Sequence, residues 1–80
     1  MKATENFRKN LQRVLSARHL SQRKVAKDAR LSYPYLNRIL RGKATPAIDI
    51  CDVISDAVGL SLGDLLSSPR EFIKKHNGSA

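Results

Sequence analysis

The 80-residue chain carries a formal net charge of +8, and 41% of its residues are hydrophobic. This length and composition favour one small folded domain and argue against intrinsic disorder. The single cysteine excludes an internal disulfide and a cysteine-rich metal site. No apolar run reaches the roughly 20 residues of a membrane span, and the N-terminal segment lacks the apolar core of a signal peptide. We therefore expect a soluble, cytoplasmic protein.

The charge is unevenly distributed along the chain. Residues 1–43 hold twelve Lys and Arg residues against two acidic ones, whereas residues 44–80 hold three basic and five acidic residues. A small domain with one strongly positive half typically binds a phosphate backbone. Solubility is the alternative explanation, but it requires no such segregation of charge.

Apolar residues spaced along one helical face predict a first helix. Its stripe consists of Phe7, Leu11, Val14 and Leu15. Thr4 is the expected N-cap, and the helix is expected to end near Arg18 or His19.

The same helix-start signal then occurs three times, as a serine cap preceded by leucine and followed four residues later by an apolar residue. Such a pair of apolar residues around a cap is a hydrophobic staple. The three serines are Ser21, Ser32 and Ser61. They predict helices that begin at Gln22, Tyr33 and Leu62.

The remaining segments complete an all-α prediction. Residues 42–46 read as a loop, and a fourth helix ends at Gly59. Its apolar stripe is Ile48, Cys51, Ile54 and Val58. Ser68 and Pro69 predict a short last helix. We expect a compact bundle of five short helices, with a sixth at the C-terminus, in a single domain of residues 1–76 and a flexible tail of residues 77–80.

The second and third predicted helices are separated only by about Ala29 to Ser32. Two short helices joined so tightly must cross at a steep angle, as in a helix-turn-helix. The expected inner contacts are Val25, Ala26, Ala29 and Leu31. Ala26 is small where the two backbones approach closest.

The third helix, residues 33–41, has two distinct faces. At 100° per residue, Leu36, Ile39 and Leu40 form the core side. The opposite side is Pro34, Asn37, Arg38 and Arg41, flanked by Tyr33 and Tyr35. Arginine can bind a guanine edge through two hydrogen bonds, asparagine an adenine edge, and an apolar surface can meet a thymine methyl. This face is typical of a recognition helix in a major groove.

The segment from Leu20 to Leu66 resembles the lambda-repressor/Cro-like (XRE-type) helix-turn-helix family without a gap. The matching positions include LSQ at 20–22, Ala26, Ser32, Leu36, Arg41-Gly42, Pro46, Gly59 and Leu65-Leu66. Two departures stand out. Arg30 occupies a left-handed turn position that is often glycine, and Pro34 with the tyrosines is unusual, so no known operator sequence is transferred.

The resemblance implies roles for individual residues. The positions implied to contact bases are Tyr33, Pro34, Asn37 and Arg38. The positions implied to contact the DNA backbone are Gln22, Arg41 and Lys43. Three further backbone contacts are expected apart from the resemblance: Tyr35, because a tyrosine can form a hydrogen bond to phosphate, Arg23, from its charge and its place in the second helix, and Ser32.

Each of these assignments has a plainer alternative. Tyr33 and Tyr35 would also fit at the rim of the core, and Arg38 as a solvated surface residue. Cys51 lies on an apolar stripe and is expected in the core. The two histidines have no partners at metal-ligand spacing, so we expect no metal, no cofactor and no enzymatic activity.

The combined features predict a sequence-specific, double-stranded DNA-binding transcriptional regulator, of the phage or bacterial repressor type. We expect a homodimer on an inverted-repeat operator. The expected self-contact residues are Leu62, Leu66, Phe72 and Ile73. Two alternatives remain, namely an antitoxin-like module that also binds a toxin protein, and a non-specific nucleic-acid binder. The sequence fits both a complete protein and the N-terminal part of a longer one.

Overall fold

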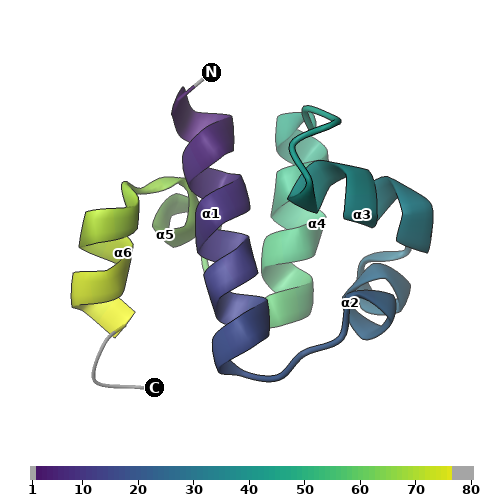
Figure 1. The fold of residues 1–80 in the computed structure, drawn as a ribbon, viewed down its shortest axis with the longest axis horizontal. Helices are drawn as coiled ribbons and strands as arrows, with labels where there is room; N and C mark the ends of the chain where they lie inside the picture. The colour runs from purple at the N-terminus through teal and green to yellow at the C-terminus, as the bar shows by residue number, and fades with distance from the viewer. Residues whose placement is uncertain (1, 77–80) are drawn as a thin grey trace.

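The computed structural model describes residues 2–76, which form a bundle of helices without strands (Figure 1). In chain order the helices are α1 (Lys2–Ala17), α2 (Gln22–Ala29), α3 (Tyr33–Leu40), α4 (Ile48–Val58), α5 (Leu62–Leu66) and α6 (Pro69–His76). The predicted all-α fold is confirmed, including the sixth helix. The tail predicted at residues 77–80 lies outside the described residues.

Serine side chains begin four of the helices. The hydroxyl oxygens accept backbone N–H groups as follows: Ser21 from Lys24 at 3.0 Å, Ser32 from Tyr35 at 3.2 Å, Ser61 from Asp64 at 3.1 Å and Ser68 from Glu71 at 3.2 Å. Each hydrogen bond satisfies one of the N–H groups that lack a partner in the first turn of a helix. The helix starts predicted from these serines are therefore confirmed.

The first helix begins earlier than predicted. Thr4 lies within the first turn of α1, which starts at Lys2, so its assignment as the N-cap was wrong. Neither glycine nor proline precedes Thr4, and Glu5 is favourable near a helix N-terminus, so nothing delays the helix until that residue. Shortly after α1 ends, His19 takes a φ of 54° and turns the chain toward α2.

The core lies around α1, which runs through the middle of the bundle, with α5 and α6 on one side and α3 and α4 on the other (Figure 1). The largest fully buried apolar side chains are Phe7, Leu11, Leu36, Ile39, Ile54 and Leu65. Cys51 is buried in the same cluster, as predicted. The inner side of α3 is therefore anchored on α1 and its outer side is left free.

Two apolar residues lie where they were not expected. Ile48, predicted in the buried stripe of α4, is 58% exposed, because at 100° per residue it points roughly a quarter turn away from Cys51 and Ile54. Phe72, predicted as an exposed self-contact residue, is only 3% exposed, because α6 folds back onto α1 and buries it. The half-buried Leu62, Leu66 and Ile73 stay near the surface.

A buried asparagine joins α1 to the end of α5. The Nδ2 group of Asn10, which is 1% exposed, donates to the carbonyl oxygens of Leu65 at 3.0 Å and Ser67 at 2.8 Å. The last carbonyls of a helix have no partner within the helix. Asn10 supplies that partner, so a polar residue in the core holds α5 at a defined distance from α1.

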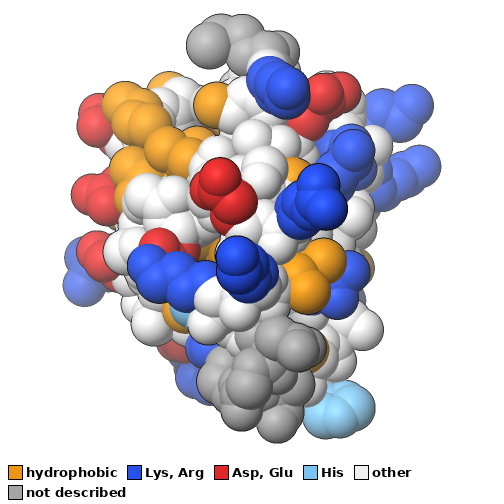
Figure 2. All heavy atoms as spheres, turned by 90° about the vertical axis from the view of Figure 1, so that its left-hand side faces the viewer, with side chains coloured by type: hydrophobic (Ala, Val, Ile, Leu, Met, Phe, Trp, Pro, Cys, Tyr) orange, Lys and Arg blue, Asp and Glu red, His pale blue; other side chains and the backbone are white. Residues whose placement is uncertain are grey.

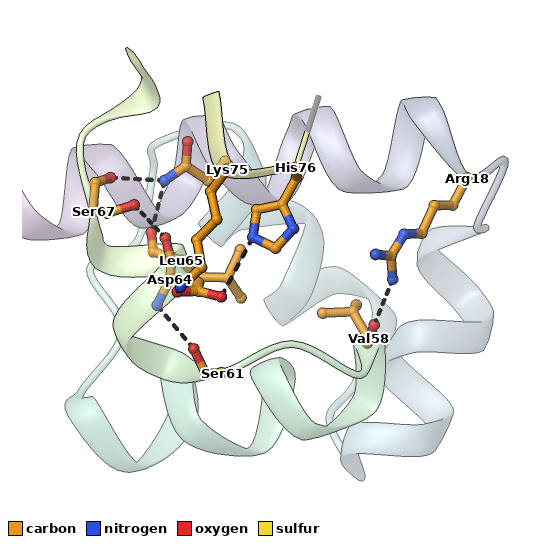
Figure 3. A network of polar contacts seen from close by, with 9 residues as sticks. Arg18, Val58, Ser61, Asp64, Leu65, Ser67, Lys75 and His76 are labelled. Atoms are coloured by element: carbon orange, nitrogen blue, oxygen red, sulfur yellow. Dashed lines mark hydrogen bonds and ion pairs between the residues drawn. The ribbon is translucent and has the colours of Figure 1, made fainter. Parts of the chain in front are cut away.

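An acidic residue in α5 binds the last helix. Asp64 Oδ1 lies 2.8 Å from Lys75 Nζ, and Asp64 Oδ2 lies 3.3 Å from His76 Nε2 (Figure 3). The hydrogen bond from Lys75 holds the pKa of Asp64 below its ordinary value. The His76 ring also packs against Phe72, with ring centroids 4.5 Å apart. These contacts secure α6 next to α5.

We expect Asn10→Ala to lower the free energy of unfolding by about 1–3 kcal/mol, because the carbonyls of a buried and of a half-buried hydrogen bond lose their donor. Urea unfolding followed by circular dichroism measures the loss. Asn6→Ala is the matched control, since Asn6 makes one half-buried hydrogen bond of 3.2 Å to the carbonyl of Leu66. Equal losses in the two variants would contradict the role given to Asn10.

The lowered pKa of Asp64 predicts an acid-sensitive contribution to stability. The ionised carboxylate stabilises the fold above the unfolded carboxyl pKa of about 3.9, and this contribution disappears as pH falls through the lower folded pKa. Urea midpoints at neutral and acidic pH should therefore differ less for Asp64→Asn than for the parent protein. Asp52→Asn, which removes an exposed carboxylate that joins none of the ion pairs among residues 2–76, should leave that difference unchanged.

Candidate nucleic-acid interface

The turn between α2 and α3 occupies residues 30–32. Arg30 adopts φ 59° and ψ 40°, the left-handed conformation predicted for this position, and its N–H donates to the carbonyl of Lys27 at 3.1 Å. Leu31 N–H reaches the carbonyl of Ala26 at 2.8 Å. Ala26 is 2% exposed at the approach of the two helices. The hydrogen bonds and close packing define a tight helix-turn-helix, even though a non-glycine residue costs about 1 kcal/mol at Arg30.

The outer side of α3 presents the residues expected from the sequence. Leu36, Ile39 and Leu40 are buried inward, as predicted. The exposed residues of the outer side are Tyr33, Pro34 and Arg38, whereas Tyr35 and Asn37 are half-buried. The helix ends at Leu40, one residue earlier than predicted, so Arg41 is its exposed C-cap. Pro34 lies in the first turn, where its missing N–H breaks no helical hydrogen bond.

One hydrogen bond connects the two helices across their outer sides. Asn37 Nδ2 donates to Gln22 Oε1 at 2.9 Å, so the fifth residue of α3 meets the first residue of α2. The bond orients both amides. One N–H and the oxygen of Asn37 remain for an adenine edge, and the Nε2 group of Gln22 remains as a donor for a phosphate.

Each tyrosine of α3 lies beneath an arginine. The guanidinium carbon of Arg23 is 4.6 Å from the centre of the Tyr33 ring, and that of Arg38 is 5.7 Å from the centre of the Tyr35 ring. Cation–π contacts of this kind stabilise by about 0.5–1 kcal/mol at exposed sites. The tyrosines therefore hold two arginine side chains against the helix surface, which explains why aromatic residues occur on the outer side of α3.

The loop after α3 is also held from α1. Gly42 takes a φ of 73°, and the N–H groups of Lys43 and Ala44 both donate to the carbonyl of Arg38. Gln12 Nε2 donates to the carbonyl of Leu40, and the Arg8 side chain lies against Gly42, where a Cβ atom would be 3.5 Å from its Nε. The sequence reasoning missed Arg8 and Gln12, because a contact between α1 and this loop leaves no signal at any fixed spacing.

The cations of this surface are uncompensated. None of the ion pairs within residues 2–76 involves Arg23, Arg38, Arg41 or Lys43. Figure 2 faces the α5 and α6 side of the bundle and leaves α3 on the far side; on the face that it draws, Lys and Arg side chains gather toward the upper right and acidic and apolar side chains toward the upper left. The positive potential over α3 and its loop therefore suits a polyanion.

The geometry brings the predicted residues together in two groups. One group joins the start of α2 to α3, through Gln22 with Asn37 and Arg23 with Tyr33. The other surrounds the middle and end of α3, with Tyr35 beneath Arg38 and with Arg41 and Lys43 at the loop. Ser32 caps α3 through its hydroxyl oxygen, and its O–H remains a donor. The roles of these residues toward DNA remain predictions.

Neither a metal centre nor a membrane span is found in the part of the chain that the structure describes. Within residues 2–76 no group of three His, Cys, Asp or Glu residues is placed to hold a metal ion. None of the described helices has the length and hydropathy required to cross a membrane.

Comparison with known proteins agrees with this arrangement. A helix-turn-helix family model matches residues 11–65, more than half of the chain. The protein therefore belongs to the lambda-repressor/Cro-like (XRE-type) helix-turn-helix family, a family of DNA-binding transcription regulators that is not typically catalytic. No curated protein and no solved structure matches the chain.

The hydrogen bond between Gln22 and Asn37 predicts energetic coupling. In a double-mutant cycle of Gln22→Ala and Asn37→Ala, the unfolding free energies should deviate from additivity by about 0.5–1.5 kcal/mol. The control cycle combines Gln22→Ala with Lys43→Ala, between which no hydrogen bond exists, and should be additive. Additivity in both cycles would show that the two amides act independently.

Proposed function

We propose that the protein is a sequence-specific repressor of transcription, of the phage or bacterial type, that inserts α3 into the major groove of an operator. The observation that carries the proposal is the outer side of α3, where Arg38 and Asn37 present groups suited to base edges beside a tight helix-turn-helix. Occupying an operator would block access of the polymerase. The protein would act in the cytoplasm as a single DNA-binding domain.

Base recognition falls to the first turns of α3. Arg38 would donate two hydrogen bonds to a guanine edge, and Asn37, oriented by Gln22, would pair with adenine. Pro34 and Tyr33 would offer apolar surface to a thymine methyl. Because Tyr35 already holds Arg38 from below, that side chain would lose less conformational freedom on binding.

Contacts with phosphates would fix the register of α3. The residues proposed for them are Gln22, Arg23, Ser32, Tyr35, Arg41 and Lys43. The loop residues Arg41 and Lys43 are exposed and carry unpaired charge, which suits them to the strands that border the groove. Such contacts contribute affinity without sequence preference.

A homodimer on an inverted repeat completes the proposal. A single module of this size buries a limited interface, so specific affinity usually requires two copies on a two-fold site. The half-buried Leu62, Leu66 and Ile73 are the proposed self-contact residues, and Phe72 is excluded because it is buried.

Selection of binding sites from a random duplex library near physiological salt tests the proposal. The expected result is an enriched inverted repeat with half-sites roughly one helical turn apart. Binding that enriches no sequence and collapses as salt rises would instead show a non-specific nucleic-acid binder.

Two substitutions should separate base contacts from phosphate contacts. Arg38→Ala should cost about 1–3 kcal/mol of binding free energy and relax specificity at one base position. Lys43→Ala should weaken binding to all sequences alike and reduce the salt slope by about 1. Fluorescence anisotropy with the selected site and single-base variants measures both effects. An Arg38→Ala protein that kept its full sequence preference would remove Arg38 from the recognition set.

A further inference from the structure

The outward side of α4 differs in chemistry from the rest of this basic protein. Three carboxylates, those of Asp49, Asp52 and Asp56, follow one another at spacings of three and four residues and are all exposed. Ile48 and Val53, exposed by 58% and 38%, lie beside them. We call these five residues the α4 face. It holds three of the seven acidic residues of a chain whose net charge is +8.

The carboxylates of the α4 face have no cationic partner in the folded domain. The ion pairs within residues 2–76 join Lys24 to Asp28 and join Lys75 and His76 to Asp64. Like charges three and four residues apart on one helix repel each other and weaken it slightly. The negative charge of α4 therefore contributes nothing to the internal ion pairs of the fold, and it remains available to a cation from outside.

A groove that is open to solvent lies beside Asp56, between the end of α2 and the second half of α4, and its lining is part apolar and part polar. Its volume is about 450 Å³. Its floor consists of Ala29, Val53 and Ala57, and its rim of Asp28, Arg30 and Asp56. The two alanines are short, so the groove has room for one large apolar side chain from a partner. Arg30 offsets charge only at the α2 rim, which leaves Asp49 and Asp52 as the most negative part of the α4 face.

None of the proposed DNA contacts belongs to the α4 face, and α4 lies behind α3 in the bundle (Figure 1). The carboxylates of the α4 face repel phosphate, so this side of the molecule is unsuited to DNA. The exposed large apolar side chains of the described residues are Tyr33, Ile48 and Val53. Ile48 and Val53 belong to the α4 face itself, and Tyr33, which has Arg23 over its ring, is a proposed DNA contact. A second copy would therefore have to give up that contact to supply an exposed apolar side chain next to a cation. A separate partner with its own cations fits better.

We propose that the α4 face docks a basic amphipathic helix of a partner protein. An apolar side chain of that helix enters the groove beside Val53, and Lys or Arg residues flanking it pair with Asp49, Asp52 and Asp56. Burial of the apolar residue supplies affinity, and the charge pairs supply orientation and exclude acidic partners. The inference does not depend on the proposed repressor function, because it involves neither α3 nor DNA.

A synthetic helix of roughly 16 residues, with a leucine stripe flanked by lysines, is a direct probe. The net charge of +8 disfavours binding of a cationic peptide except at an acidic surface, so specific binding would indicate an acidic site. Titration into ¹⁵N-labelled protein should produce saturable chemical-shift changes confined to α4 and the end of α2. A peptide with serine in place of leucine should bind more weakly.

Variants identify the residues responsible. Neutralising the α4 face with Asp49→Asn, Asp52→Asn and Asp56→Asn together should weaken binding about tenfold. Val53→Ser should weaken it as well. Glu5→Gln, which removes an exposed carboxylate of α1 that is in no ion pair with another described residue, should have no effect. Thermal unfolding midpoints confirm that each variant folds.

Four outcomes of the peptide titrations would overturn the proposal. They are the absence of saturable shifts, shifts spread over α3, unchanged affinity in the neutralised variant, and equal affinity for the serine peptide. Shifts of the α4 face that grow with protein concentration in the absence of peptide would identify a second copy as the occupant instead, and would also overturn it.

Discussion

The turn from Arg30 to Ser32 sets the direction of α3, and the site depends on that direction. With so few residues between α2 and α3, the left-handed Arg30 and the hydrogen bond from Leu31 to Ala26 allow essentially one crossing. Burial of Leu36 and Ile39 then fixes the rotation of α3 about its own axis. Direction and rotation together place Asn37 against Gln22 and Tyr33 beneath Arg23, so the outer surface follows from constraints on the inner one.

Most of the fold could be predicted because its signals are local. A capping serine accepts a hydrogen bond from the N–H group only three residues later, so the whole signal lies within a few consecutive residues. The starts of α2, α3 and α5 can therefore be predicted from the sequence. Thr4 shows the limit of this reasoning, since a residue that can cap a helix can equally lie within it. The prediction of Phe72 as a self-contact residue was wrong for another reason, because its burial depends on the packing of α6 against α1.

Contacts between residues that lie far apart in the sequence could not be predicted, because they leave no local signal. Asn10 meets the end of α5 across more than 50 positions, and a buried asparagine has no sequence pattern that distinguishes it from an exposed one. The membership of the site is predictable from helical periodicity, which places Arg38 and Asn37 outward. The contacts between residues of the site cannot be predicted in this way, because Gln22 and Asn37 belong to different helices and the distance between them depends on the crossing angle.

The division of α3 into an inner and an outer side has a consequence for how this protein can diversify. Tyr33, Pro34 and Arg38 make no contribution to the buried core, so they can change without rebuilding the scaffold. Asn37 is different, because a change there leaves Gln22 without its partner. New binding preferences should therefore arise by single replacements at Tyr33, Pro34 or Arg38, but by paired replacements at Gln22 and Asn37. Sequences of relatives and of engineered libraries would reveal the paired replacements as covariation.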